Sequence, residues 1–142
     1  MNTYPTKKLD PKWIREGVTD ETVEWTKSFG EFLQQDDSIS RGSSPLTTSQ
    51  IRKFFGELKR IQADPVKYGE DIPLLKAKLA YAVGRDVSKW GGKVVYKSKI
   101  KEFYEELEKG INAVRTKEKT DINNFVKLVE AIVAYHKYYG GK

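Results

Sequence analysis

The sequence predicts an all-α fold, a single compact bundle of about five helices in one domain spanning residues 1–142. Three observations predict it. Apolar residues recur at helical spacing along most of the chain, and capping and stop signals divide this pattern into segments. A chain of 142 residues can bury one hydrophobic core. Only residues 86–97 carry a strand signal.

The first half of the chain predicts an arm and two helices. Residues 1–18 contain two prolines and no period, which indicates an irregular N-terminal arm. Thr19 can cap a first helix, and Asp36–Pro45 is rich in Ser, Gly and Asp, which predicts a loop. Thr47 and Gln50 form a capping-box pattern that begins a second helix. Its apolar stripe comprises Ile51, Phe54, Phe55, Leu58 and Ile61.

The second half predicts three more helices. One begins near Pro73, and its stripe of small residues, Ala77, Ala80 and Gly84, is expected to pack inside the bundle. Residues 86–97 form an excursion, either a loop or a hairpin that turns at Gly91-Gly92. Helical period returns over 98–115. The last helix is expected to open at Thr120 as its cap and to stop at Gly140-Gly141.

Composition excludes several classes of protein. The chain has no cysteine, so disulfides, cysteine-ligated zinc and thiol nucleophiles are absent, and a reducing cytoplasm is the expected compartment. The N-terminus lacks the apolar region of a signal peptide, and no stretch approaches the roughly 18–20 apolar residues of a membrane span. We therefore expect a cytoplasmic protein without a membrane contact.

Catalytic residues are scarce, so an enzyme is not expected. His136 is the single histidine and lies at the end of an apolar helix face, which favours a packing role. The glutamates of segment 102–108 lie between Lys101 and Lys109, as in an ordinary salt-bridged helix surface, and Asp64, Glu70 and Asp71 fall in a turn. No phosphate-binding glycine loop is present. No cofactor or metal is expected.

The positive charge of the chain is concentrated in its middle third. Residues 48–100 contain 12 Lys+Arg and 5 Asp+Glu, a net of +7, against +6 for the whole chain. Basic residues gathered on folded elements are the electrostatic feature of a polyanion binder, whereas the alternative is a lysine-rich solvated surface. Lys78, Tyr81 and Arg85 share one helix side, where Tyr81 can stack a base or pack against the bundle.

Three blocks of sequence resemble the small subunit of type III-A CRISPR–Cas interference complexes, the Csm small-subunit family. They are LTTSQIRKFFGEL at 46–58, LLKAKLAYAVGR at 74–85 and NFVKLVEAIVAYHKYYGGK at 124–142. The three blocks follow the order and spacing of the family, and their combination is more specific than any one block. Residues 1–40 and 86–97 add nothing to the resemblance.

The resemblance implies a non-catalytic all-α subunit that binds the backbone of the crRNA and of single-stranded target RNA. It also implies contacts with the backbone subunits and the large polymerase-like subunit, and self-association by stacking, with a dimer of the free chain left open. Arg52, Lys53 and Arg85 match the basic pattern of the family, so the resemblance implies that they bind RNA. Helical geometry adds Lys59 and Lys78, and Lys137 is expected to extend the basic face. Lys89, Lys93, Lys97 and Lys99 stay unassigned.

Two other functions remain open at this point. TTSQIRKFF resembles the start of a recognition helix, which would indicate a helix-turn-helix DNA-binding regulator, although the following QADPVKYGED is long and broken by proline for that motif. A helical adaptor that docks an acidic protein partner through the basic face is the second alternative.

Overall fold

The computed structural model describes residues 3–39 and 42–142, apart from the Trp90 side chain, and it is mostly helical. Residues 1–2 of the predicted arm and 40–41 of the predicted loop lie outside the described residues. The elements in chain order are α1 (Lys12–Arg15), α2 (Asp20–Gln34), α3 (Thr48–Ala63), α4 (Pro65–Tyr68), η1 (Gly69–Asp71), α5 (Leu74–Arg85), β1 (Val87–Trp90), β2 (Lys93–Tyr96), α6 (Ile100–Ala113) and α7 (Lys119–Tyr138).

The predominantly helical prediction is confirmed, with two corrections. Over the described ranges the chain has seven α-helices where about five were predicted, because α1 and α4 have four residues each and are too short to show a period. The fold is also not purely α, since β1 and β2 form a small antiparallel sheet. No helix in the described part of the chain is both long and apolar enough to cross a membrane.

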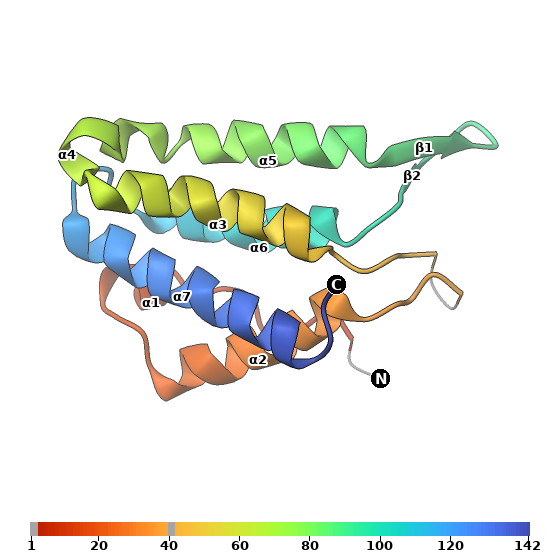
Figure 1. The fold of residues 1–142 in the computed structure, drawn as a ribbon, viewed down its shortest axis with the longest axis horizontal. Coiled ribbons are helices and arrows are strands. Elements are labelled where there is room, and N and C mark those ends of the chain that lie inside the picture. The colour runs from red at the N-terminus through yellow and green to blue at the C-terminus, as the bar shows by residue number, and fades with distance from the viewer. Residues whose placement is uncertain (1–2, 40–41) are drawn as a thin grey trace.

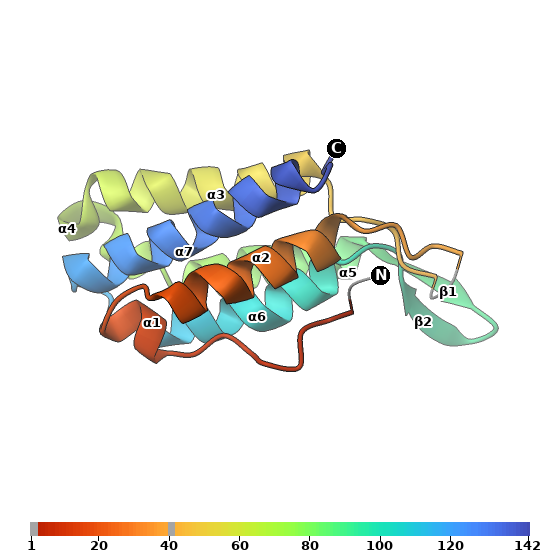
Figure 2. The same ribbon diagram turned by 90° about the horizontal axis from the view of Figure 1, so that it is seen from below.

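Helix α7 is the central element of the bundle. It packs against α2, α3, α1 and α6, and both ribbon views show it running through the body (Figures 1 and 2). Helix α5 lies at the edge, where it packs mainly on α6 and touches α3 lightly. One apolar core joins the long helices, and its rings Phe29, Phe103 and Phe125 have no exposed surface.

The long helices α2 and α3 begin at side-chain caps, whereas α5, α6 and α7 have no side-chain cap at their starts. Thr47 and Gln50 form the predicted capping box of α3, and Thr19 forms a second box with Thr22 at α2. The predicted cap of α7, Thr120, is wrong, because α7 begins at Lys119, directly after Glu118, and has no side-chain cap. At the other end Gly140 has a φ of 100°, the left-handed conformation that stops a helix.

The N-terminal arm is less irregular than predicted, because it packs into the bundle. It contains α1, and the side chains of Trp13 and Ile14 are buried. The buried carboxylate of Glu106 on α6 accepts hydrogen bonds from the Tyr4 hydroxyl at 2.7 Å and the Leu9 amide at 2.9 Å. Burial, with the Glu106 hydrogen bond, raises the pKa of the Tyr4 phenol.

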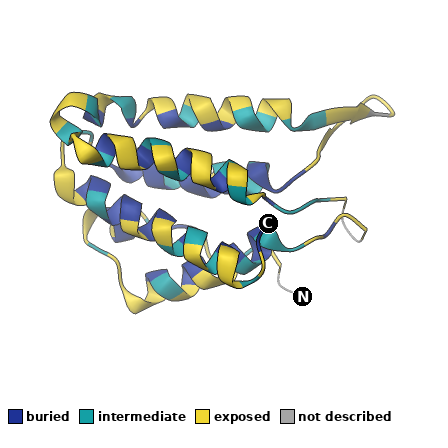
Figure 3. Cartoon of the chain, in the orientation of Figure 1, coloured by how far each residue is buried: buried dark blue, intermediate teal, exposed yellow. Residues whose placement is uncertain are grey.

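The stripe of small residues on α5 faces solvent, so the expectation that it packs inside the bundle is wrong. Ala77, Ala80 and Gly84 are all exposed, and Leu75 and Leu79 are the residues of α5 that are buried. Figure 3 shows exposed colour along much of α5 and over the hairpin beyond it. An edge helix needs only a narrow apolar side, which explains why two leucines suffice to hold it.

The excursion at 86–97 is a β-hairpin that projects from the end of α5 (Figures 1 and 2). Trp90 pairs with Lys93 across a two-residue turn in which Gly91 and Gly92 have φ of 56° and 80°. Two positive φ values define the type I′ turn, whose twist matches that of the strands. At its base the Asp86 carboxylate accepts hydrogen bonds from the amide and hydroxyl of Ser98 at 2.7 and 2.8 Å.

A buried ion pair fastens the end of this hairpin segment to the loop after α2. The Lys99 ammonium lies 2.7 Å from a carboxylate oxygen of Asp37, and both side chains are only 1% exposed. The same ammonium donates hydrogen bonds to the carbonyls of Phe32 and Gln35 at 2.8 and 2.6 Å. Lys99 is therefore a structural cation, which removes it from the unassigned basic residues.

Candidate nucleic-acid interface

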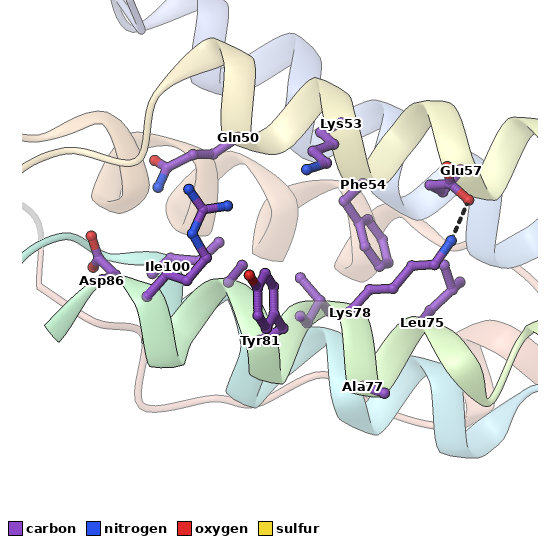
Figure 4. A pocket seen from close by; sticks show the side chains of 13 residues that line it. Gln50, Lys53, Phe54, Glu57, Leu75, Ala77, Lys78, Tyr81, Asp86 and Ile100 are labelled. Carbon is purple, nitrogen blue, oxygen red and sulfur yellow. Dashed lines mark hydrogen bonds and ion pairs between the residues drawn. The ribbon is translucent and has the colours of Figure 1, made fainter.

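A groove of about 710 Å³ lies between α3 and α5, the two most basic helices of the middle third. Phe54, Leu75 and Leu79, which are buried, form much of its floor. Figure 4 shows side chains from both helices meeting across it. The complete lining is Gln50, Lys53, Phe54, Glu57, Leu75, Ala77, Lys78, Leu79, Tyr81, Ala82, Arg85, Asp86 and Ile100.

The apolar stripe of α3 determines where its basic residues point. Ile51 and Leu58 are buried in the core, so the opposite side of the helix faces solvent. Successive residues of an α-helix are about 100° apart, which places Arg52 and Lys59 together on that outer side. Lys53 lies one step further round and lines the groove. The side chains of these three cations are exposed.

An ion pair bridges the groove toward the end that lies away from the hairpin (Figure 4). The Lys78 ammonium on α5 lies 2.8 Å from a carboxylate oxygen of Glu57 on α3, as the dashed line in Figure 4 shows. Arg60 also approaches Glu57, at 3.5 Å, and pairs with Asp71 at 3.1 Å. The hydrogen bond from Lys78 is the main reason that the pKa of Glu57 is lowered. Lys78 is therefore a partly neutralised cation.

The hairpin end of the groove carries two cations, Lys53 and Arg85. Within the described residues, neither Lys53 nor Arg85 forms a salt bridge, although both line the groove. Asp86 is the acid next to them, and its carboxylate is engaged by Ser98. Arg85 places its guanidinium carbon 5.6 Å from the centre of the Tyr81 ring, within cation–π distance.

The structure brings together three of the six predicted RNA-binding residues. Lys53, Lys78 and Arg85 line one groove. Arg52 and Lys59 lie on the outer side of α3 and do not line it. Lys137 is on α7, where its ammonium approaches the carbonyl of Gly141 at 3.4 Å. The predicted common side of Lys78, Tyr81 and Arg85 is confirmed by their place in the lining.

Sequence reasoning left the hairpin lysines unassigned, and the structure shows where they lie. Lys89, Lys93 and Lys97 are exposed, on or beside strands that continue directly from α5. The hairpin therefore extends the basic surface beyond Arg85. A signal for this was present in the sequence, because lysines flank both sides of the predicted Gly91-Gly92 turn.

His136 makes a structural contact, and the prediction of a solvated helix surface for the glutamates of 102–108 is wrong for Glu106, which is buried. His136 is buried and its Nε2 donates a hydrogen bond to the Leu46 carbonyl at 2.6 Å, which fits the predicted packing role. Burial lowers the pKa of this imidazole. Within the described ranges, no group of three or more His, Cys, Asp and Glu residues is arranged to hold a metal ion.

Comparison with known proteins identifies the family. The model of the family described as Csm2 Type III-A matches residues 20–142. A protein named CRISPR system Cms protein Csm2, from Streptococcus thermophilus, is 29% identical over 131 residues, which cover 88% of this chain and 97% of that protein. No solved structure matches this chain. The chain belongs to the Csm2 type III-A family and is a small subunit of a type III-A CRISPR complex.

Proposed function

We propose that this subunit binds the phosphate backbone of the crRNA and its target RNA through the α3–α5 surface. The observation that carries the proposal is the pair of cations at the hairpin end of the groove, Lys53 and Arg85, which line one depression and lack an acidic partner among the described residues. A polyanion would supply the missing negative charge, and its binding would release counterions. Arg52 and Lys59 on the outer side of α3 extend this surface.

The subunit also bridges neighbouring subunits of the complex in this proposal. Family membership supports the other Csm proteins, including the large polymerase-like subunit, as partners. The hairpin offers exposed apolar side chains for such contacts, since Val94 is 54% and Val95 39% exposed on a projecting element. A two-stranded hairpin is marginal by itself in water, so a partner surface would stabilise it. The chain acts by binding and has no catalytic step of its own here.

A salt series tests the proposal. The full chain would be titrated against fluorescent single-stranded RNA of two unrelated sequences, duplex RNA and duplex DNA between 50 and about 300 mM salt. We expect sequence-indifferent RNA binding whose log K falls linearly with log salt. The double variant Lys53→Gln/Arg85→Gln should lower the magnitude of the slope on single-stranded RNA by about 1.4, because each neutralised phosphate contributes about 0.7.

The control variant removes one positive charge on the side of the helical bundle away from the groove. Lys27 is an exposed residue of α2, which lies across the bundle from α5 (Figure 1), and Lys27→Gln should leave the slope unchanged. An unchanged slope in the groove double variant would overturn the role of Lys53 and Arg85. Tight binding to one duplex DNA sequence would favour the regulator, and no nucleic-acid binding at 50 mM salt would favour the adaptor.

A further inference from the structure

The groove between α3 and α5 contains an exposed aromatic ring, Tyr81, that phosphate binding alone does not require. Tyr81 is 68% exposed although it lines a depression with an apolar floor. Figure 4 shows its ring rising from α5 toward α3 with the hydroxyl at the far end. Exposed Tyr138 makes an edge-on ring contact with Tyr139 at 5.0 Å, whereas no described aromatic ring pairs with Tyr81.

The residues around Tyr81 on its own helix leave the ring open to a ligand. Residues three and four positions away are its neighbours on the helix surface, and two of these are Ala77 and Gly84. Both are exposed, and a Cβ built on Gly84 would meet nothing within 4 Å. Because the side chains of these exposed small residues are short, they do not block the space beside the ring, and a flat molecule can approach it.

The charges beside the ring indicate what that molecule is. Arg85 lies over Tyr81 at 5.6 Å, and Lys53 lines the same groove from α3. Proteins that hold single-stranded nucleic acid combine a cationic groove for the backbone with aromatic rings on which bases stack. The groove volume of 710 Å³ falls within the range of small-molecule sites, about 300–1,000 Å³.

We propose that this groove is a nucleotide subsite, in which one base of single-stranded RNA stacks on Tyr81 while Arg85 and Lys53 neutralise the phosphates on either side of it. The inference rests on the proposed function, and it adds a contact that is independent of salt. A partner helix would also fit an apolar groove, but its two cations, which have no acidic partner in the described part of the chain, favour a polyanion over a protein. Stacking accepts any base, so this contact is compatible with sequence-indifferent binding.

The test combines a change in the protein with a change in the RNA. Tyr81→Leu keeps an apolar side chain but removes the ring, and Tyr81→Phe keeps the ring. We expect Tyr81→Leu to weaken binding of a single-stranded RNA about 5- to 150-fold without changing the salt slope, and Tyr81→Phe to stay within about twofold of the parent chain. Because Tyr81 is exposed, both variants should fold, which far-UV circular dichroism verifies.

An RNA of the same length with abasic nucleotides removes the bases and keeps the phosphates. The parent chain should bind it more weakly than the normal RNA, and Tyr81→Leu should bind the two RNAs almost equally. Equal affinity of Tyr81→Leu and the parent chain for normal RNA overturns the stacking inference but leaves the phosphate contacts intact. An unchanged salt slope in Lys53→Gln/Arg85→Gln overturns the phosphate contacts of these two cations, and no RNA binding by the parent chain at 50 mM salt overturns the proposed function itself. If Tyr81→Leu loses only binding to another protein of the complex, the groove is a protein-docking site and the inference is wrong.

Discussion

Replacing Asp37 by Asn should destabilise the chain strongly, because it removes the negative charge that pairs with the buried Lys99 ammonium. Lys99 and Asp37 are each 1% exposed and 2.7 Å apart. Breaking a buried ion pair by removing one partner costs about 3–5 kcal/mol. This is about a fifth or more of the 5–15 kcal/mol by which a typical domain is stable. At about 4 °C per kcal/mol, the melting temperature should fall by about 12–20 °C.

Equilibrium unfolding in urea, followed by far-UV circular dichroism, measures this free energy directly. The matched control is Asp71→Asn, which makes the same chemical change in an exposed pair with Arg60, where the expected cost is at most about 1 kcal/mol. Replacing both members of the buried pair, as Asp37→Leu/Lys99→Met, should cost less than the sum of the single replacements, since no lone charge is left. If Asp37→Asn costs no more than Asp71→Asn, the pair is not buried in solution and the reasoning fails.

Two further predictions concern pH and glycine. The pKa of folded His136 is lowered, so the unfolded chain takes up the proton more readily and stability falls as pH drops below about 6.5, by at most about 1.4 kcal/mol per pH unit. Urea midpoints between pH 5 and 8 should show this loss in the parent chain and not in His136→Gln; identical profiles would contradict it. Gly110→Ala would place a Cβ 2.5 Å from the buried Phe125 ring and should cost about 1–3 kcal/mol. The control is Gly56→Ala, whose added Cβ would meet nothing within 4 Å and should stabilise the folded chain by about 0.4–1 kcal/mol in the same unfolding assay. A loss of stability in Gly56→Ala, or no loss in Gly110→Ala, would refute the packing argument.

The long helices could be predicted because each buries one stripe of side chains, and two of them, α2 and α3, also begin at recognisable caps. The α3 capping box of Thr47 and Gln50 is a four-residue pattern that a reader of the sequence can find. Short elements lack such a signal. Helix α1 has four residues, and the burial of Trp13 and Ile14 depends on contacts with distant parts of the chain. Local sequence does not encode those contacts.

In the candidate site, too, relations within one helix could be predicted and contacts between helices could not. The common side of Lys78 and Arg85 follows from their spacing of seven residues on one helix. The partial neutralisation of Lys78 could not be predicted, because Glu57 is 21 positions away and belongs to another helix. The difference between the prediction and the structure is largest for Lys99. It counted as one of the basic residues of the middle third, yet it is buried against a loop whose sequence is polar and irregular.

The contacts of Glu106 show that the unit that folds is longer than the region shared with the family. The family model begins at residue 20, yet Tyr4 and Leu9 supply two hydrogen bonds to this buried carboxylate. A chain shortened to the shared region would keep every basic residue of the groove. It would also expose α6 and leave Glu106 with the Lys109 ammonium, at 2.9 Å, as its remaining partner among these contacts. The matched region and the packed structure therefore have different N-terminal limits, and any shortened version should respect the second.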